Sequence, residues 1–215
     1  MKNSIKIITT MLFMGFMQNT VAQETTSAYD AKFGVKGGVN FSNMYTEDVD
    51  DENVLTGFNL GVFAKLPINN FIAIQPELYY TTKGSELTYN NSFAQGTAKF
   101  RMNYIEAPLL LVVNLTKNFN IHGGGYVAYL VDGKATNKSN DGLFSSEDEL
   151  DNDDFNKIDA GLAAGLGIDV GTFSVGARYN YGLTTVGKEK TYGGTNYTFP
   201  DGKNSVLNLY VALSF

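Results

Sequence analysis

The sequence contains no cysteine, and its apolar runs are short. Without a thiol the chain has no disulfide framework, no thiolate metal site and no lipid-modified N-terminal cysteine. A transmembrane helix needs about 20 consecutive apolar residues, and the run from Ile7 to Met17 is too short to be one. Any membrane span must therefore be built from β-strands.

Proline is also scarce, with 4 residues against 23 glycines, 13 tyrosines and 15 phenylalanines. The mean hydropathy is close to zero, which a helical membrane protein could not combine with a lipid-facing surface. A β-barrel can, because half of each strand faces a polar lumen. This composition fits a single all-β domain.

The N-terminal residues have the order of charge and hydrophobicity that is typical of a signal peptide. Lys2 and Lys6 precede the apolar run, and Thr20-Val21-Ala22 offers small residues where a signal peptidase cleaves. We therefore expect residues 1–22 to be a signal peptide and residues 23–215 to form an outer-membrane β-barrel domain.

Alternation of apolar and polar residues with a period of two, the pattern of a half-buried strand, occurs eight times. The stretches lie near residues 32–42, 56–66, 72–83, 101–115, 121–132, 158–169, 173–183 and 206–215. The last is the clearest: Leu207, Leu209, Val211, Leu213 and Phe215 share one face. The pattern predicts an eight-stranded antiparallel up-and-down transmembrane β-barrel. We expect the barrel-assembly machinery to recognise the C-terminal strand that ends at Phe215.

The predicted connections alternate between short and long. Pro67 to Asn70, Thr116 to Asn118 and Gly171-Thr172 make the short ones, whereas the segments after the first, third, fifth and seventh strands are long. In outer-membrane barrels short turns face the periplasm and long loops face outward. Both termini are therefore expected in the periplasm, and the even strand number lets the sheet close without edges.

A soluble barrel of the lipocalin kind is the main alternative, because it shows the same alternation with apolar residues inside. The apolar face here carries aromatics at both strand ends, which is typical of the membrane interface. The predicted belts are Phe33, Phe119, Phe173 and Phe215 at the periplasmic end, and Phe41, Phe58, Tyr80, Tyr129 and Tyr181 at the outer end. We therefore favour the bacterial outer membrane, with its lipid and lipopolysaccharide as surroundings.

Four strings resemble the PorT-like outer-membrane β-barrel family common in the Bacteroidota, which is similar in shape to the small OmpA-like barrels. They are Tyr104–Leu110, Gly123–Leu130, Arg178–Leu183 and the closing strand to Phe215. The resemblance covers essentially the whole mature chain and implies the fold and the location. The family's named member belongs to a secretion and gliding apparatus, and these strings carry no sign of that role.

Charged residues at inward positions are close to balanced. Those placed near mid-height by counting along each strand are Lys36, Glu77, Glu106 and Arg178. Side chains can fill an eight-stranded barrel, and pairing stabilises charges that would be costly alone. We predict a lumen charge network of these four residues that plugs the barrel; a gate or narrow ion path is the alternative.

The residues that could catalyse a reaction do not form a convincing site. Glu77 and Glu106 lie on neighbouring strands, but a nearby Arg and Lys favour ion pairs over a proton donor. His122, the single histidine, is predicted on the inward face near the periplasmic end, so a triad for outer-leaflet lipid lacks its base. Gly123–Gly125 precedes no helix and is no phosphate loop. We expect no enzyme activity, no cofactor and no metal site.

The formal net charge is -6, and acidic residues gather in two outer segments. Nucleic acid is therefore an unsuitable partner. Asp151-Asn152-Asp153-Asp154 lacks the EF-hand spacing, although divalent ions could bridge such loops to lipopolysaccharide phosphates. Tyr192, Tyr197 and Phe199 in the last long loop are the better candidates for protein contact.

Together these patterns predict a non-enzymatic barrel with a structural or surface-interaction role carried by its outer loops. A transport or protein-secretion accessory role is the alternative. Charge density predicts that residues 43–55 and 133–156 are disordered or ion-bridged rather than packed.

Overall fold

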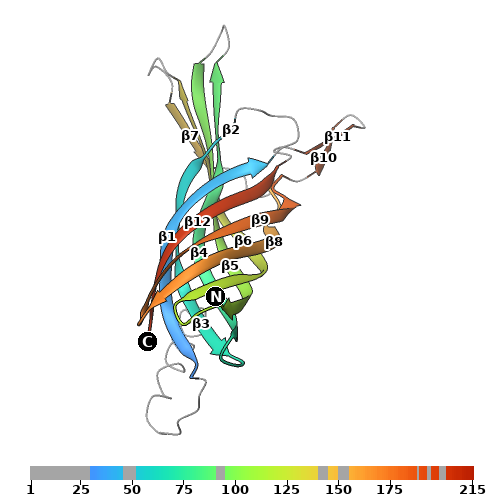
Figure 1. Cartoon of the computed structure of the whole chain (residues 1–215). Helices are drawn as coiled ribbons and strands as arrows, with labels where there is room; N and C mark the ends of the chain where they lie inside the picture. The colour runs from blue at the N-terminus through green and yellow to red at the C-terminus, as the bar shows by residue number, and fades with distance from the viewer. Residues whose placement is uncertain are drawn as a thin grey trace, which may run out of the picture.

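The structure is a computed structural model, and it describes residues 30–45, 52–90, 95–139, 145–149, 155–187, 189–192, 195–198 and 202–215. Eight antiparallel strands close into a barrel (Figure 1). They are β1 (Lys32–Tyr45), β3 (Leu55–Pro67), β4 (Ile72–Asn90), β5 (Gln95–Asn114), β6 (Phe119–Ser139), β8 (Ile158–Val170), β9 (Phe173–Thr185) and β12 (Lys203–Ser214). The predicted fold class is confirmed. No helix in these ranges is long and apolar enough to cross a membrane.

The barrel closes where the first strand meets the last. β1 pairs with β3 along one edge and with β12 along the other, from Gly34 opposite Ser214 to Tyr45 opposite Lys203. The backbone groups of Phe33 and Phe215 exchange two further hydrogen bonds, of 3.3 and 2.8 Å. Every barrel strand thus has two neighbours, and no edge within the wall is left to lipid.

Side chains alternate between the outside and the lumen as the sequence predicts. On β12, Leu207, Leu209 and Val211 are exposed, whereas Val206 and Tyr210 are buried. Since a strand turns successive side chains to opposite faces, this alternation wraps the barrel in an apolar band and leaves the polar residues inside.

The three short turns depend on local side-chain hydrogen bonds. The Asn69 carboxamide oxygen accepts from the backbone N–H groups of Phe71 and Ile72, both at 2.8 Å. Thr116 caps the next turn in the same way, and Gly171 supplies a φ of 64° to the third. Asn, Thr and Gly favour these conformations, so the short connections are tight.

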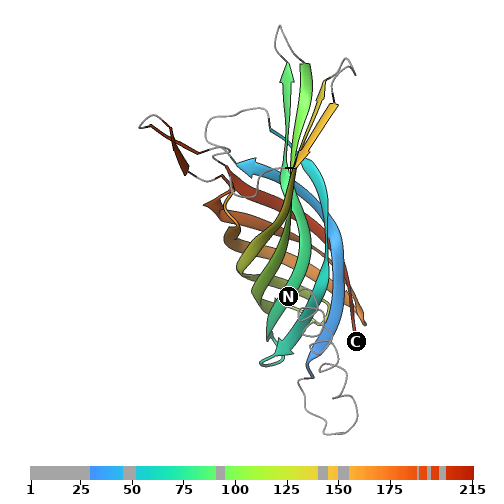
Figure 2. The same cartoon turned by 180° about the vertical axis from the view of Figure 1, so that it is seen from behind.

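At the opposite end several strands continue beyond the barrel (Figures 1 and 2). β4, β5 and β6 extend together and are joined by β7 (Ser145–Glu149), which pairs with β6. We call the extended parts of these four strands the ribbon. β2 (Glu52–Asn53) pairs with β4, and β10 (Glu189–Tyr192) forms a hairpin with β11 (Thr195–Thr198).

The ribbon corrects the sequence-based boundaries. Residues 133–156 were expected to be unpacked, but β6 runs on to Ser139 and residues 145–149 form β7; residues 43–55 likewise include the end of β1 and β2. A strand with water on both faces needs no apolar alternation, so its pairing leaves no period-two signal. Most acidic residues of these segments, and Phe199, lie outside the described residues.

The lumen has an apolar wall as well as a polar one. Met102, Tyr104, Leu110, Tyr126 and Leu130 are buried together on β5 and β6. Phe155 and Val186, which lie beyond the outer ends of β8 and β9, join this cluster. The backbone of Asn156 donates to Val186 at 2.9 Å, so these segments are tied together at the outer end.

Candidate functional site

Three charged side chains meet in the half of the lumen nearer the short turns. Lys36 of β1 lies 3.1 Å from Glu77 of β4, and Arg178 of β9 grips the same carboxylate with both terminal nitrogens, at 2.5 and 3.0 Å. All three residues are buried. Bidentate Arg–carboxylate pairing is the strongest common form of this interaction. We call Lys36, Glu77 and Arg178 the inner triad.

Aromatic rings and the single histidine surround the inner triad. The Lys36 ammonium lies 3.8 Å from the centre of the Tyr210 ring, a cation–π distance. His122 Nε2 accepts from Arg178 Nε at 3.3 Å, and its Nδ1 lies 3.3 Å from the Asn120 carboxamide oxygen. These two contacts together require the tautomer that is protonated at Nδ1. Both ring nitrogens of His122 are therefore engaged.

A second cluster lies farther toward the outer end. Lys83 of β4 contacts Glu106 of β5 at 2.6 Å and Asp159 of β8 at 2.9 Å. The Lys83 ammonium also lies 4.3 Å from the centre of the Tyr126 ring. Asn204 donates to Asp159 at 3.0 Å. We call Lys83, Glu106 and Asp159 the outer triad.

Amides separate the two triads. Asn40 donates to Thr81 and accepts from Asn59 and Asn208, at 2.8 to 2.9 Å. Asn180 donates to Glu106 at 3.1 Å from the same strand that carries Arg178. Neutral hydrogen-bonding groups thus line the lumen between the two triads. The triads have opposite net charge, because the inner triad has two cations and the outer triad two anions.

The structure therefore divides the four residues expected to form one network. It brings Lys36, Glu77 and Arg178 together but places Glu106 in the outer triad. The reason is register: Glu106 is paired with Tyr79, two residues beyond Glu77 on β4, so it lies one inward position nearer the outer end. Lys83 and Asp159 complete its cluster. Both occupy inward-facing positions in the alternation of their strands, and this feature of the sequence could have identified them.

Sequence reasoning also gave no role to the inward tyrosines. Tyr79, Tyr104, Tyr126 and Tyr210 are buried, and each ring lies within 5.8 Å of a lysine ammonium. Each buried lysine thus has two rings as well as carboxylates around it. Tyrosines at inward positions beside inward lysines would have pointed to this arrangement.

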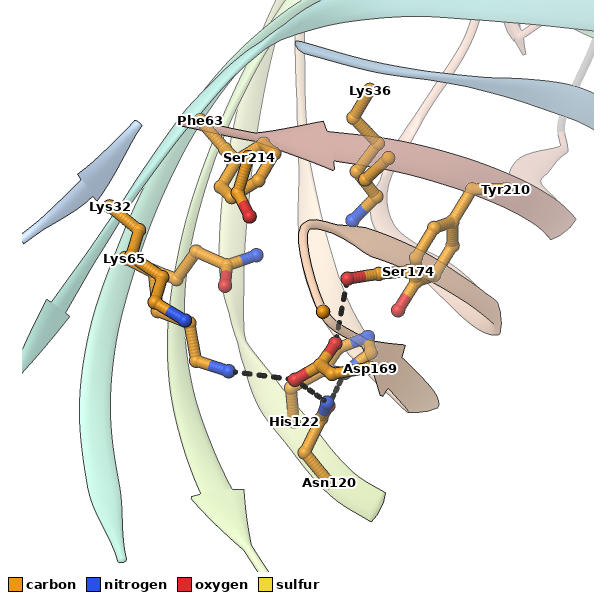
Figure 3. A pocket seen from close by; sticks show the side chains of 13 residues that line it. Lys32, Lys36, Phe63, Lys65, Asn120, His122, Asp169, Ser174, Tyr210 and Ser214 are labelled. Carbon is orange, nitrogen blue, oxygen red and sulfur yellow. Dashed lines mark hydrogen bonds and ion pairs between the residues drawn. The ribbon is translucent and has the colours of Figure 1, made fainter. Parts of the chain in front are cut away.

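Ser174, His122 and Asp169 share a pocket at the end of the barrel where the short turns lie (Figure 3). Their contacts differ from those of a nucleophile, base and orienting acid. Ser174 donates to Asp169 directly at 2.7 Å, while His122 contacts Asn120 and Arg178. The geometry therefore provides no serine–histidine hydrogen bond that could activate a nucleophile.

The residues expected in the periplasmic aromatic belt lie at the ends of the strands near the short turns, whereas two of those expected at the outer end, Tyr80 and Tyr129, lie in the middle of β4 and β6, which continue into the ribbon. Phe119 and Phe173 begin β6 and β9, Phe33 is the second residue of β1, and Phe215 follows β12. The rings of Phe58 and Tyr80 lie 6.0 Å apart on neighbouring strands. All nine side chains are exposed except Phe119, which is half-buried: Phe33, Phe41, Phe58, Tyr80, Phe119, Tyr129, Phe173, Tyr181 and Phe215.

A closed antiparallel barrel with an apolar outer band and a charged lumen is the architecture of a bacterial outer-membrane protein. The sequence comparison agrees, since the family described as the outer membrane protein beta-barrel domain matches residues 21–187. The chain belongs to this family and is a protein of the bacterial outer membrane. No curated protein matches its sequence.

Two solved structures show the same kind of barrel. Ail, the attachment invasion locus protein of Yersinia pestis, solved with the heparin analogue sucrose octasulfate, is 16% identical with a TM-score of 0.50. Neisserial surface protein A is 17% identical with a TM-score of 0.50. In both cases the alignment covers 86% of this chain and 99% of the other. At such identities the likeness concerns the fold, an OmpA-like outer-membrane barrel.

Proposed function

We propose that this chain is a surface-interaction protein, in which the barrel is a sealed membrane anchor and the ribbon is the contact surface. The observation that carries this proposal is the continued pairing of β4, β5 and β6 beyond the barrel, with β7 added at one side. A structural role alone requires no such extension, since short connections would close the same barrel.

The edge of the ribbon suggests how a partner could bind. β7 pairs with β6 along one edge, and within the described residues no strand pairs with its other edge. An unpaired edge can accept an extended segment of another protein through main-chain hydrogen bonds. Charged residues on such an edge discourage pairing between identical copies.

The charge of this edge favours a basic partner. Residues 145–149 read Ser-Ser-Glu-Asp-Glu, and Asp151, Asp153 and Asp154 follow closely. Ail was solved with a sulfated, polyanionic ligand, but a polyanion would be repelled by this acidic segment. We therefore infer an extended protein segment rich in Lys or Arg as the partner, with the charge contributing mainly to association rate and specificity.

The lumen supports an anchor rather than a passage. Both triads are buried and amides lie between them, and this packing argues against the transport or secretion-accessory alternative. The plug formed by the two triads remains our proposal for the function of the charged network.

The remaining features of the proposal concern the surroundings of the barrel. The alternation of short and long connections supports periplasmic termini and an outward ribbon. The exposed apolar band supports contact with outer-membrane lipid and lipopolysaccharide, and the closing strand ending at Phe215 is the proposed signal for the barrel-assembly machinery. Membership of the PorT-like subgroup rests on the four strings and is part of this proposal.

The test is to shorten the ribbon without disturbing the barrel. Glu86 and Lys99 are directly paired, and so are Ala135 and Asp148; joining each pair through Asn-Gly, a favoured two-residue turn, removes both tips. Cells bearing the full chain should bind beads coated with an alternating Lys-Val peptide, and cells with the shortened ribbon should not. An acidic Glu-Val peptide is the bead control.

A second variant separates charge from shape. Replacing Glu147, Asp148 and Glu149 by Lys keeps the ribbon length but should exchange the preference, so that the Glu-Val beads bind and the Lys-Val beads do not. Equal binding of both bead types by the full and shortened proteins would refute the proposed contact surface.

A further inference from the structure

The pocket at the end of the short turns has an excess of positive charge. Lys32, Lys36 and Lys65 reach it from neighbouring strands β1 and β3, and Asp169 is the acidic residue that faces them (Figure 3). Lys32 and Lys65 lie together on one side, whereas Lys36 lies on the other side with Tyr210 and Ser174 (Figure 3). Lys36 and His122 are buried, so the floor of this pocket is part of the packed lumen rather than a loose surface.

Three of about four acceptor positions of the Asp169 carboxylate are used. Its carboxylate accepts from Lys65 at 3.1 Å, from Asn120 at 3.1 Å and from Ser174 at 2.7 Å. Glu77 lies behind the pocket floor and accepts hydrogen bonds from both Arg178 and Lys36. It also accepts from Gln75 at 2.6 Å. Each carboxylate already contacts a cation, so Asp169 and Glu77 together face three lysines and one arginine.

The donor capacity of the lysines is not used up. An ammonium group has three N–H donors; Lys36 makes one hydrogen bond to Glu77, and Lys65 makes two, to Asp169 and Asn114. Lys32 is exposed at the rim, and its ammonium group has no hydrogen bond or ion pair with any described residue. The surplus consists of N–H donors and of positive charge, which is the complement of an oxyanion.

We propose that this pocket binds a phosphate group, held between Lys32, Lys36 and Lys65. Three separate ammonium groups act as point charges, which suit a tetrahedral oxyanion, whereas planar carboxylates are matched better by the fork of an arginine. The one arginine nearby, Arg178, is already engaged with Glu77. The phosphate comes either from a free phosphate compound or from a phospholipid headgroup at the barrel rim.

The experiment uses the whole mature protein refolded in a non-ionic detergent. Inorganic phosphate is titrated by calorimetry at constant ionic strength, with sodium chloride replaced in proportion. The wild type should bind one phosphate, and Lys32→Gln should weaken binding at least about fivefold, since it removes one charge-assisted contact. Because Lys32 is exposed, this variant should fold normally.

Lys203→Gln is the matched control, since it removes the same charge from β12 at the opposite end of the barrel. It should leave the phosphate affinity unchanged. No heat of binding with the wild type, or equal weakening in Lys32→Gln and Lys203→Gln, would overturn the proposal.

A competition arm distinguishes the two sources of phosphate. The protein is placed in mixed micelles that contain either phosphatidic acid, whose phosphate is a monoester, or a neutral lipid-like detergent without phosphate. If phosphatidic acid lowers the measured affinity for inorganic phosphate, a lipid headgroup is identified as an occupant. An unchanged titration identifies a free phosphate compound, and both results retain the site.

Discussion

Replacing Glu77 by Gln should destabilise the barrel more than replacing either cation beside it. The inner triad contains two cations and one carboxylate, all buried. Removing the carboxylate leaves two uncompensated positive charges in the lumen, the Lys36 ammonium and the Arg178 guanidinium. Removing Lys36 instead leaves the bidentate Arg178–Glu77 pair, which is neutral as a unit.

The expected sizes follow from these contacts. Breaking a buried ion pair from one side costs about 3–5 kcal/mol, and Glu77→Gln breaks contacts with both cations, so we expect about 5 kcal/mol. Arg178→Ala removes two hydrogen bonds to Glu77 and one to His122 and leaves space, so we expect a cost of about 3 kcal/mol. Lys36→Met keeps a side chain of similar length and leaves the neutral Arg178–Glu77 pair, so we expect a loss of about 1–2 kcal/mol in the free energy of unfolding.

The outer triad provides the matched control, because its charge ratio is inverted. Lys83 is the single cation between Glu106 and Asp159. Here Lys83→Met should cost about 5 kcal/mol, whereas Glu106→Gln should cost about 1–2 kcal/mol because the Lys83–Asp159 pair remains. The ratio of cations to anions, rather than the residue type, would thus determine which substitution destabilises each triad most.

The assay is urea unfolding in phospholipid vesicles. Folded and unfolded fractions are separated by their different migration on unheated gels, and circular dichroism provides the second measurement. The chain has no tryptophan, so fluorescence of that residue cannot be used. If Lys36→Met proves as costly as Glu77→Gln, the charge-ratio argument is wrong.

Three further outcomes are expected. In planar bilayers the unmutated protein should give no well-defined channels, because both triads and the amides lie across the lumen of a narrow barrel. Stable unitary currents would favour the transport alternative. Protease added to intact cells should cut within 46–51 or 150–154 at an earlier time than it cuts the three short turns. The strand segments 133–139 and 145–149 should resist longer because their backbones are paired. Early cleavage at the turns would mean that the turns, rather than the ribbon, face outward. Phe215→Ala should lower the amount of folded protein in the outer membrane of cells but change refolding in detergent little, because the backbone contacts with Phe33 remain; equal loss in both settings would argue against recognition by the assembly machinery.

The sequence by itself determined the number of barrel strands, the face that each of their residues occupies and the short turns. Lipid on one side and a polar lumen on the other impose a period of two on every spanning strand, so Leu209 and Tyr210 could be assigned to opposite faces without coordinates. The turns at Asn69, Thr116 and Gly171 depend on neighbours only a few residues away. Such local constraints can be read directly from a sequence.

Only the tertiary structure decided which charges meet and how far the strands continue. Glu77 lies 41 residues from Lys36 and 101 from Arg178, and their contact depends on the register of strands that lie across the lumen from one another. A shift of one inward position moved Glu106 into the cluster of Lys83 and Asp159. The ribbon escaped prediction because its strands are held by backbone pairing, and the sequence there carries no period-two alternation that would indicate them.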